Sequence, residues 1–282
     1  MTVASTVDLA GWEVRRIGFG AMQLPGPRVF GPPADPPAAV ALLRRAVELG
    51  VNHIDTSDYY GPHVANELLR EALHPYPHDL ALVSKVGARR DETGGWHPWD
   101  APADLRTGIE DNLRRLDVER LAAVNLRLMD QSTQDFDAQL EAMATARADG
   151  LIDGIGLSNV SLAQLEHALT CVPVSCVQNS YNLFSRESTD LLTACGERGI
   201  PFVPYFPLGS AFPGARSVVT DPVVRSVADR LGCTSAQVGL AWLLAQGPHV
   251  LLIPGTSSLT HLEQNLAAGS VTLDQAALDA LS

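Results

Sequence analysis

Three residues of the sequence could together form a proton donor. Asp55 and Tyr60 lie five positions apart where an apolar segment ends, and Lys85 ends a second apolar segment thirty residues later. A phenol has a pKa of about 10, but a neighbouring ammonium group stabilises the phenolate and lowers that pKa toward neutrality. A carboxylate beside the lysine would keep the lysine charged. The residue types and their spacing therefore predict general-acid catalysis with Tyr60 as the acid.

Each of these residues also has an ordinary structural interpretation. An aspartate at the end of a strand commonly caps a turn, and a lysine there can extend its side chain to water. Their joint placement at successive strand ends favours the catalytic interpretation over coincidence.

The elements that must position these residues alternate along the chain. Short apolar segments rich in β-branched residues alternate with longer segments of helical periodicity, which predicts parallel strands joined by helices. Predicted strands lie at 16–22, 51–56, 80–86, 121–128, 152–158, 174–179, 200–205 and 250–254. Predicted helices lie at 36–49, 64–73, 102–116, 135–149, 161–170, 187–198, as a pair within 221–246, at 259–268 and at 274–281.

Eight strand-helix units without an intervening linker predict one α/β domain over residues 1–282, a single (β/α)8 TIM barrel. Residues 7–16, with Gly11 in the middle, predict a short N-terminal hairpin that closes the bottom of the barrel. The alternative is an open doubly wound sheet, which would bind a dinucleotide through a Gly-x-Gly-x-x-Gly turn. Only Gly18-Phe-Gly20 approaches that motif, so the barrel is favoured.

Composition narrows the class of partner. The net charge of −12 disfavours nucleic acid and membrane surfaces as partners. Four cysteines without Cys-x-x-Cys spacing and scattered histidines predict neither disulfides nor a metal site. The N-terminus lacks a signal-peptide pattern, and together with the cysteine count this predicts a cytoplasmic protein. Nothing in the sequence indicates an oligomeric state.

Polar residues recur where the predicted strands end. In a barrel of this type the reactive groups gather at the C-terminal ends of the strands. His53 and Asn125, which alternation places on the faces of Asp55 and Arg127, are interpreted as core polar groups. The residues at predicted strand ends are Asp55, Lys85, Arg127, Ser158, Asn159, Gln178 and Tyr205.

Several motifs in the right order resemble the aldo-keto reductases over nearly the whole chain. They are Asn52-His-Ile-Asp55-Thr-Ser-Asp-Tyr-Tyr60-Gly, Ser84-Lys85, Gly154-Ile-Gly-Leu-Ser-Asn159, Gln178-Asn-Ser-Tyr-Asn182 and Tyr205-Phe-Pro-Leu-Gly209. The resemblance implies that Tyr60 protonates a substrate carbonyl oxygen while a nicotinamide cofactor delivers hydride to the carbonyl carbon. Lys85 and Asp55 would adjust the pKa of the Tyr60 phenol.

The same resemblance implies a set of cofactor-binding residues. Ser158, Asn159 and Gln178 would bind the nicotinamide carboxamide, and Tyr205 would stack on the nicotinamide ring. Residues expected along the pyrophosphate are Leu208 and Ser210, and those expected at the adenosine end are Gly255, Thr256, Ser257, Ser258, His261, Gln264 and Asn265.

The chain departs from the family pattern at Arg127, where most members have histidine. Arginine is permanently charged and cannot shuttle a proton, which leaves Tyr60 as the only plausible acid. Arg127 could donate hydrogen bonds to the substrate carbonyl, or to a phenolate-like oxygen beside an aldehyde. The competing interpretation is that Arg127 forms a buried pair with Asp55 and never meets the substrate.

A second departure lies at the adenosine end, where many relatives carry lysine and arginine for a 2′-phosphate and this chain has Gly255 and His261. The neutral donors of residues 256–258 and the helix that follows still favour an anion. We therefore expect NADPH as the cofactor, with NADH as the alternative.

Aromatic residues are expected at the mouth of the barrel and suit a small planar aldehyde. They are Phe30, Tyr59, Trp96 and Trp99. The two tryptophans could instead merely shield the barrel top. Further segments, including Tyr60-Gly-Pro-His-Val64, resemble family members that reduce pyridoxal and imply pyridoxal to pyridoxine as the reaction. The alternatives are another aldehyde or ketone, or a nicotinamide-binding sensor with vestigial turnover.

Overall fold

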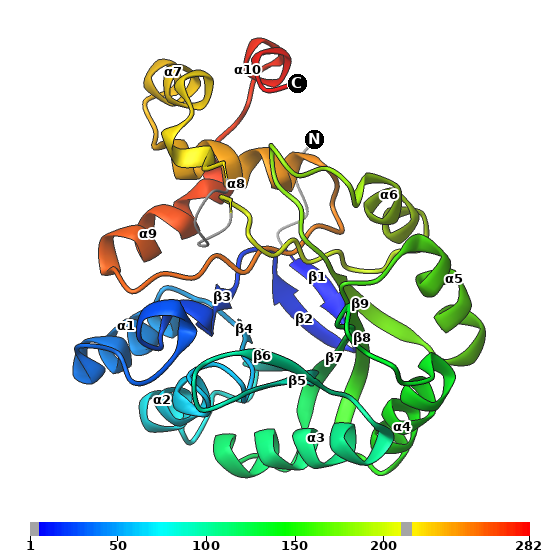
Figure 1. The fold of residues 1–282 in the computed structure, drawn as a ribbon. Helices are drawn as coiled ribbons and strands as arrows, with labels where there is room; N and C mark the ends of the chain where they lie inside the picture. The colour runs from blue at the N-terminus through cyan, green and yellow to red at the C-terminus, as the bar shows by residue number, and fades with distance from the viewer. Residues whose placement is uncertain (1–5, 210–215) are drawn as a thin grey trace.

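The computed structural model describes residues 6–209 and 216–282 of the 282-residue chain. Parallel strands form one curved sheet at the centre of the molecule (Figure 1). Its order is β3 (Phe19–Gly20), β4 (His53–Asp55), β5 (Ala81–Arg90), β7 (Leu121–Arg127), β8 (Ile152–Ser158) and β9 (Val174–Gln178).

Two further segments close this sheet into a barrel. Phe202 bridges Val177 of β9 on one side and Val250 on the other, and Leu252 bridges Ile17 next to β3. The predicted (β/α)8 barrel is therefore confirmed, and the open doubly wound alternative is wrong.

The seventh and eighth predicted strands, 200–205 and 250–254, form isolated bridges rather than continuous ladders. Prolines at positions 201, 204 and 254 account for this, because proline has no amide N–H to donate to a neighbouring strand. Backbone hydrogen bonds such as Val203 N to Val177 O, 2.7 Å, still hold the segments in place.

Helices surround the barrel on its outside, and α7 and α10 project beyond this ring (Figure 1). Their bounds are α1 (Pro36–Glu48), α2 (Val64–Leu73), α3 (Pro102–Leu116), α4 (Phe136–Ala148), α5 (Leu162–Cys171), α6 (Thr189–Glu197), α7 (Pro222–Leu231), α8 (Ser235–Ala245), α9 (Leu259–Ala267) and α10 (Gln275–Ala280). Helix starts follow local chemistry: Ser161 and Gln164 form a reciprocal capping box at the start of α5.

The N-terminal hairpin lies where the sequence predicts it. β1 (Thr6–Leu9) and β2 (Trp12–Arg15) pair through a two-residue turn, in which Ala10 and Gly11 both have positive φ. Leu9 packs with Ala81, the first residue of β5, so the hairpin covers the N-terminal end of the barrel.

A second hairpin at the opposite end was not predicted. β5 continues past Lys85 and pairs antiparallel with β6 (Trp96–Trp99) through Gly87 to Arg90. Gly87 has φ +106°, and a Cβ there would lie 2.3 Å from Arg127 O, so this close approach of two strands requires glycine. The hairpin raises Trp96 above the C-terminal ends of the strands.

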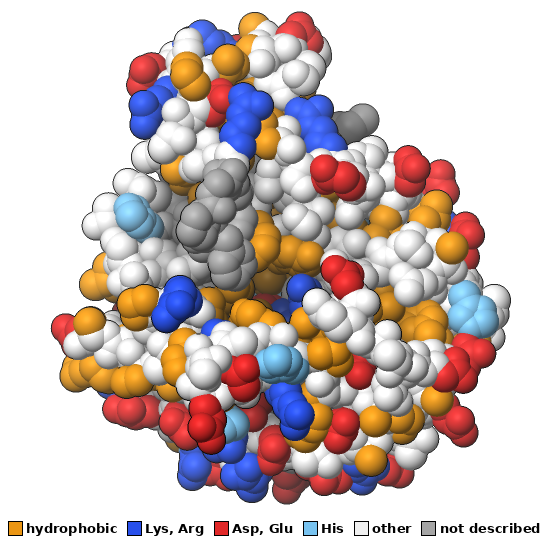
Figure 2. Space-filling model, viewed as in Figure 1, with side chains coloured by type: hydrophobic (Ala, Val, Ile, Leu, Met, Phe, Trp, Pro, Cys, Tyr) orange, Lys and Arg blue, Asp and Glu red, His pale blue; other side chains and the backbone are white. Residues whose placement is uncertain are grey.

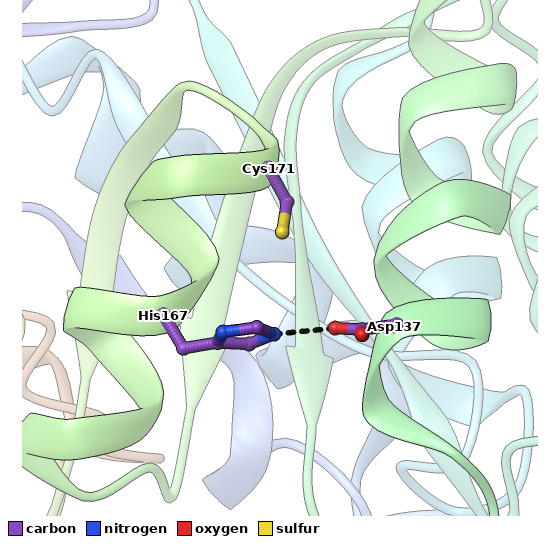
Figure 3. A group of neighbouring side chains, drawn as sticks. All are labelled: Asp137, His167 and Cys171. Carbon is purple, nitrogen blue, oxygen red and sulfur yellow. Dashed lines mark hydrogen bonds and ion pairs between the residues drawn. The ribbon is translucent and has the colours of Figure 1, made fainter.

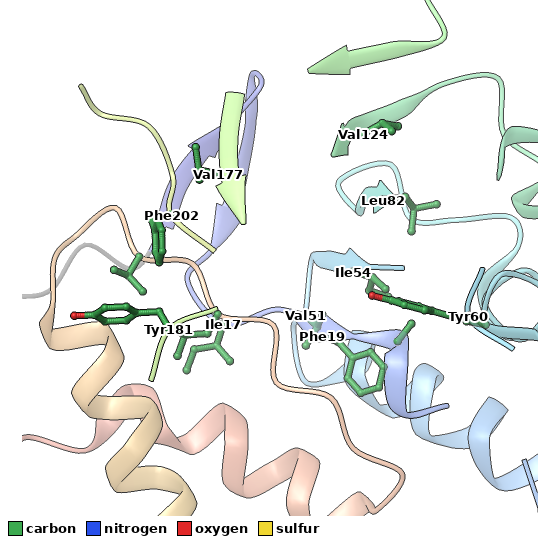
Figure 4. Packing of buried hydrophobic residues seen from close by; sticks show 14 of the residues in the cluster. Ile17, Phe19, Val51, Ile54, Tyr60, Leu82, Val124, Val177, Tyr181 and Phe202 are labelled. Carbon is green, nitrogen blue, oxygen red and sulfur yellow. The ribbon is translucent and has the colours of Figure 1, made fainter. Parts of the chain in front are cut away.

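Strand alternation divides the buried side chains into two sets. Ile54, Leu82 and Val124 belong to the main apolar core, in which Phe19 and Phe202 are also fully buried (Figure 4). The alternate positions, including His53, Asp55 and Lys85, are left to the other face of the same strands, toward the barrel interior. The sheet thus separates the main apolar core outside the barrel from an interior that holds these polar groups together with a second, smaller apolar cluster.

Candidate active site

Strand register brings the ends of three neighbouring strands to one level. Arg127 of β7 pairs with Ser158 of β8, which pairs with Gln178 of β9. Around them lies a cavity of about 350 Å³, which opens at the centre of the face shown in Figure 2. Its described lining consists of Gly20, Met22, Gln23, Asp55, Tyr59, Tyr60, Lys85, Trp96, Arg127, Met129, Gln178, Tyr205, Phe206, Pro207, Leu208, Gly209, Ile253, Pro254 and Gly255.

A buried ion pair lies at the base of the cavity. Lys85 Nζ is 2.5 Å from Asp55 Oδ1 and also donates to Thr56 O at 3.0 Å. Gln178 Nε2 donates to the other Asp55 oxygen at 2.9 Å. The side chains of Lys85 and Asp55 are only 4% and 3% exposed. Both oxygens of Asp55 are therefore engaged, and the expected alternative pairing of Asp55 with Arg127 is wrong.

Tyr60 stands directly beside this pair. Lys85 Nζ lies 4.9 Å from the centroid of the Tyr60 ring, close enough for a cation–π contact. The pKa of Tyr60 is nevertheless raised, because burial and then the Asp55 carboxylate disfavour the phenolate. This is opposite to the lowered pKa that the sequence suggested. Asp55 neutralises the ammonium at contact distance, so the charge of Lys85 does not outweigh dehydration of the phenol.

A buried polar network anchors the segment that carries Tyr60. Thr56 Oγ1 donates to Asn66 Oδ1 at 2.8 Å, and Asn66 Nδ2 donates to Asn112 Oδ1 at 2.9 Å. Ser84 Oγ of β5 donates to the same Asn112 oxygen at 2.5 Å. The network joins α2, α3 and two strand ends. Sequence reasoning missed it, although asparagine at an otherwise apolar helix face was an available signal.

Arg127 points its charge into the cavity. Its Nη1 donates to Ser158 Oγ at 3.3 Å, and its guanidinium carbon lies 5.4 Å from the centroid of the Tyr205 ring. No carboxylate within residues 6–209 and 216–282 forms an ion pair with it. The arginine is thus held by a hydroxyl and an aromatic face rather than by a counter-ion.

The cofactor residues expected at the nicotinamide end divide into two groups. Gln178, Tyr205 and Leu208 line the cavity. Ser158 and Asn159 lie behind it: Ser158 accepts from Arg127, and Asn159 Oδ1 accepts from the Tyr205 hydroxyl at 3.3 Å. Ser210 lies outside the described residues.

The residues expected at the adenosine end lie beyond Gly255, which marks that end of the cavity. Thr256 and Ser258 cap the start of α9: Thr256 Oγ1 accepts from Ser258 N at 3.0 Å, and Ser258 Oγ accepts from His261 N at 3.4 Å. Ser257 and His261 are exposed, Gln264 is half-buried and Asn265 is buried.

Of the four predicted aromatic residues at the mouth, two line the cavity. The Tyr59 ring contacts Trp96 edge to face with centroids 5.4 Å apart, and it contacts Tyr60 at the same distance. Phe30 stacks instead against Arg90, and Trp99 lies near Gly108 of α3. Neither Phe30 nor Trp99 is part of the described lining, so their assignment to the pocket is not supported.

Part of the described lining of the cavity was not predicted from the sequence. It includes Gly20, Met22 and Gln23 after the first strand, and Met129 after β7. At Gly20 a Cβ would lie 2.4 Å from Ile253 O, so the first and last barrel segments meet there as closely as glycine permits. The signal available in the sequence was the pair of glycines at 20 and 255.

His53 and Asn125 lie below the cavity as core polar groups. Burial, opposed by Asp55 and reinforced by Lys85, lowers the pKa of His53 to about 4, so its imidazole is neutral at pH 7. Asn125 Oδ1 accepts from Cys176 Sγ at 3.4 Å.

One group of possible metal ligands lies away from the cavity lining. Asp137 on α4 and His167 and Cys171 on α5 place ligand atoms within 4.8 Å of one another, with His167 Nε2 bonded to Asp137 (Figure 3). All three residues are exposed. The sequence predicted no metal site, and these residues take no part in the chemistry of the cavity.

A barrel with a tyrosine and a lysine–aspartate pair in a cavity at the C-terminal side of its strands suits an oxidoreductase with a nicotinamide cofactor. Comparison with known proteins agrees. A model of the Aldo/keto reductase family matches residues 16–282. Pyridoxine 4-dehydrogenase of Escherichia coli is 46% identical over 99% of this chain and 97% of its own length. An uncharacterized oxidoreductase of Schizosaccharomyces pombe is 38% identical over 96% of this chain and 86% of its own.

The chain is also similar to solved structures of aldo-keto reductases. A thermostable aldo-keto reductase crystallised with the inhibitor epalrestat has a TM-score of 0.83, with 30% identity and 98% of both chains covered. An aldo-keto reductase of Klebsiella pneumoniae in complex with NADPH has a TM-score of 0.82 at 29% identity, covering 98% of this chain and 93% of that one. The chain belongs to the aldo/keto reductase family and is an oxidoreductase.

Within residues 6–209 and 216–282, none of the helices combines the length and the apolar character needed to cross a membrane.

Proposed function

We propose that this enzyme is an NADPH-dependent reductase of small aromatic aldehydes and that it converts pyridoxal to pyridoxine. The observation that carries the proposal is the placement of Tyr60, beside the Lys85–Asp55 pair, in a cavity with an aromatic wall. The name of the Escherichia coli relative supports the substrate, and the Klebsiella structure supports the cofactor.

The residues present fit a nicotinamide cofactor chemically. The cavity runs from Tyr60 to Gly255 and presents an amide at Gln178 and a flat aromatic ring at Tyr205. These groups suit a carboxamide and a nicotinamide ring respectively. Beyond Gly255, the N-terminus of α9 with Thr256 and Ser257 offers amide and hydroxyl donors to a phosphate. When bound, NADPH supplies the hydride for the reaction.

Reduction would require a proton at the carbonyl oxygen as its carbon receives the hydride. Because the pKa of Tyr60 is raised, its phenol keeps the proton until the C=O π bond breaks and the oxygen becomes a strongly basic alkoxide. Proton transfer then yields the alcohol and a phenolate, which the charge of Arg127 stabilises. Solvent restores the proton.

The test is oxidation of NADPH with pyridoxal, followed at the reduced-nicotinamide absorbance band and with the alcohol product identified. Tyr60→Phe should lower kcat about 100-fold or more, as expected for loss of a general acid, while NADPH affinity is retained. Equal, feeble rates on pyridoxal and generic aldehydes would refute the substrate assignment. Binding of NADPH without its oxidation would indicate a sensor instead.

A further inference from the structure

Among the described residues that line the cavity, Arg127 is a cation without a counter-ion. Its described lining has three charged side chains, Asp55, Lys85 and Arg127. Asp55 and Lys85 cancel each other at 2.5 Å, whereas Arg127 contacts a serine hydroxyl and an aromatic ring. The cavity therefore carries a net charge of about +1, in a chain whose overall charge is −12.

A half-buried guanidinium is costly to hold without a partner. Removing a charge from water is unfavourable unless a paired group replaces the lost hydration, and the neutral hydroxyl groups of Ser158 and Tyr205 replace only part of it. The surrounding wall of Tyr59, Trp96 and Tyr205 offers aromatic surface but no anion. An anionic oxygen on the substrate would complete the site, since a charge-assisted hydrogen bond to arginine is about twice as strong as a neutral one.

Geometry restricts where that oxygen can sit. Arg127 ends β7 in register with Ser158, so its position at the rim is fixed by the sheet. Tyr60 lines the same cavity and must reach the carbonyl oxygen that it protonates. Arg127 and the Tyr60 phenol also act on each other electrostatically, so the two groups are near each other in the cavity. We therefore expect an anionic group that meets Arg127, while the carbonyl meets Tyr60, to lie next to the carbonyl on the same ring.

We propose that the enzyme selects aryl aldehydes with an ionised hydroxyl group ortho to the formyl group, and that Arg127 binds this phenolate oxygen. The proposal rests on the proposed reductase function and defines its substrate class. Arg127 then contributes chiefly to substrate affinity, through a contact that exists before hydride transfer. A contact made only in the transition state would act on kcat instead.

The first experiment uses the unaltered enzyme with NADPH and three probes: 2-hydroxybenzaldehyde, 4-hydroxybenzaldehyde and 2-methoxybenzaldehyde. The KM for the 2-hydroxy compound should be about tenfold or more below that of the 2-methoxy compound, as expected for a hydrogen bond between charged groups. This gap should widen as pH rises through the ionisation of the substrate hydroxyl, because the methoxy group cannot ionise.

The second experiment compares Arg127→Leu and Arg127→Lys with Arg89→Leu. Arg89 is exposed on β5 and does not line the cavity, so its replacement removes the same formal charge without touching the site. Arg127→Leu should abolish the KM advantage of the 2-hydroxy compound, Arg127→Lys should restore part of it, and Arg89→Leu should keep it. NADPH affinity, measured in each variant, separates loss of cofactor from loss of substrate recognition.

The outcomes separate this inference from the function on which it rests. Reduction of all three aldehydes with equal KM would overturn the role of Arg127 and leave the reductase proposal standing. A KM gap that survives in Arg127→Leu would also overturn it. Failure of every aldehyde to oxidise NADPH would overturn the reductase proposal itself, and this inference with it.

Discussion

Asp55 accepts hydrogen bonds from Lys85 on one oxygen and from Gln178 on the other, so one carboxylate orients two residues of the site. Such a buried pair does not necessarily add stability, because dehydration of the two charges offsets their attraction. Its value here lies in geometry: it fixes Lys85 Nζ against the Tyr60 ring. Removing the charge of only one partner should therefore destabilise the fold more than removing both charges together.

Lys85→Met should lower the free energy of unfolding by about 3–5 kcal/mol, because it leaves the Asp55 charge buried and unpaired. The double variant Asp55→Asn, Lys85→Met should recover a substantial part of that loss while remaining inactive. Urea denaturation of the three proteins measures both effects. If the double variant were less stable than Lys85→Met, the unpaired charge would not be the cause.

His53 gives a prediction for stability at acid pH. Its pKa in the folded protein is about 4, below the value of about 6.5 in an unfolded chain. Between these values the unfolded chain binds a proton that the folded protein does not, so stability falls as pH falls from about 6.5 to 4. The loss should reach about 3 kcal/mol.

Denaturant unfolding at pH 7 and pH 4.5 tests this assignment. His53→Asn should reduce the difference in unfolding free energy between the two pH values. His78→Gln, at an exposed position, should leave that difference unchanged. An equal effect of both variants would show that His53 is not the responsible group.

At the scale of elements, the β5–β6 hairpin shapes the mouth of the cavity. Arg90 holds it: its guanidinium lies 4.1 Å from the Trp96 ring centroid and 5.4 Å from that of Phe30. Arg90 Nη1 also donates to Val29 O at 2.9 Å and Nε to Gly94 O at 3.0 Å. The arginine thereby joins the hairpin to the loop after the first strand and sets Trp96 against Tyr59.

Arg90→Leu should raise KM for pyridoxal about tenfold with little change in kcat, because it loosens the aromatic wall without touching Tyr60 or Lys85. Arg90→Lys keeps the charge but loses the planar fork, so it should rescue only part of the effect. Arg89→Leu on the same strand is the matched control. A fall in kcat at unchanged KM would contradict this positioning role.

Some elements of the fold could be predicted from the sequence and others could not. Ser161 is an N-cap in the sequence and in the structure, since its capping box depends on residues three apart. The hairpin of β6 was missed although its paired residues are only 6 to 12 positions apart, because Pro98 in the middle of β6 is an unfavourable residue for a strand. Trp96 and Trp99 are three positions apart on β6 and therefore point to opposite faces of the strand, which gives them different surroundings.

At the scale of the whole molecule, barrel closure joins the first strand to the last segment. Gly18 N donates to Leu252 O and Leu252 N donates to Arg16 O, both at 2.8 Å. This contact brings the segment around Gly20 beside the segment around Gly255, and both border the cavity. A ligand that spans the cavity therefore contacts both the first and the last barrel segment, and its binding should raise the free energy of unfolding of the closed barrel.

NADPH should raise the free energy of unfolding by about 2.7 kcal/mol at a concentration 100 times its Kd. The corresponding rise in Tm is measured by thermal unfolding at matched concentrations of NADPH and NADH. A smaller rise with NADH is expected because it lacks the 2′-phosphate that the N-terminus of α9 would bind. A larger rise with NADH would refute the preference for NADPH.

The sequence by itself determined the barrel, the placement of Asp55 and Arg127 at strand ends, and the N-terminal hairpin. Those features follow from periodicity and spacing within short segments, which local chemistry encodes. Only the tertiary structure decided that Asp55 pairs with Lys85 rather than Arg127, that the pKa of Tyr60 is raised, and which aromatic residues line the cavity. Each of these depends on burial and on contacts between distant segments, and those quantities exist only once the strands have closed around the site.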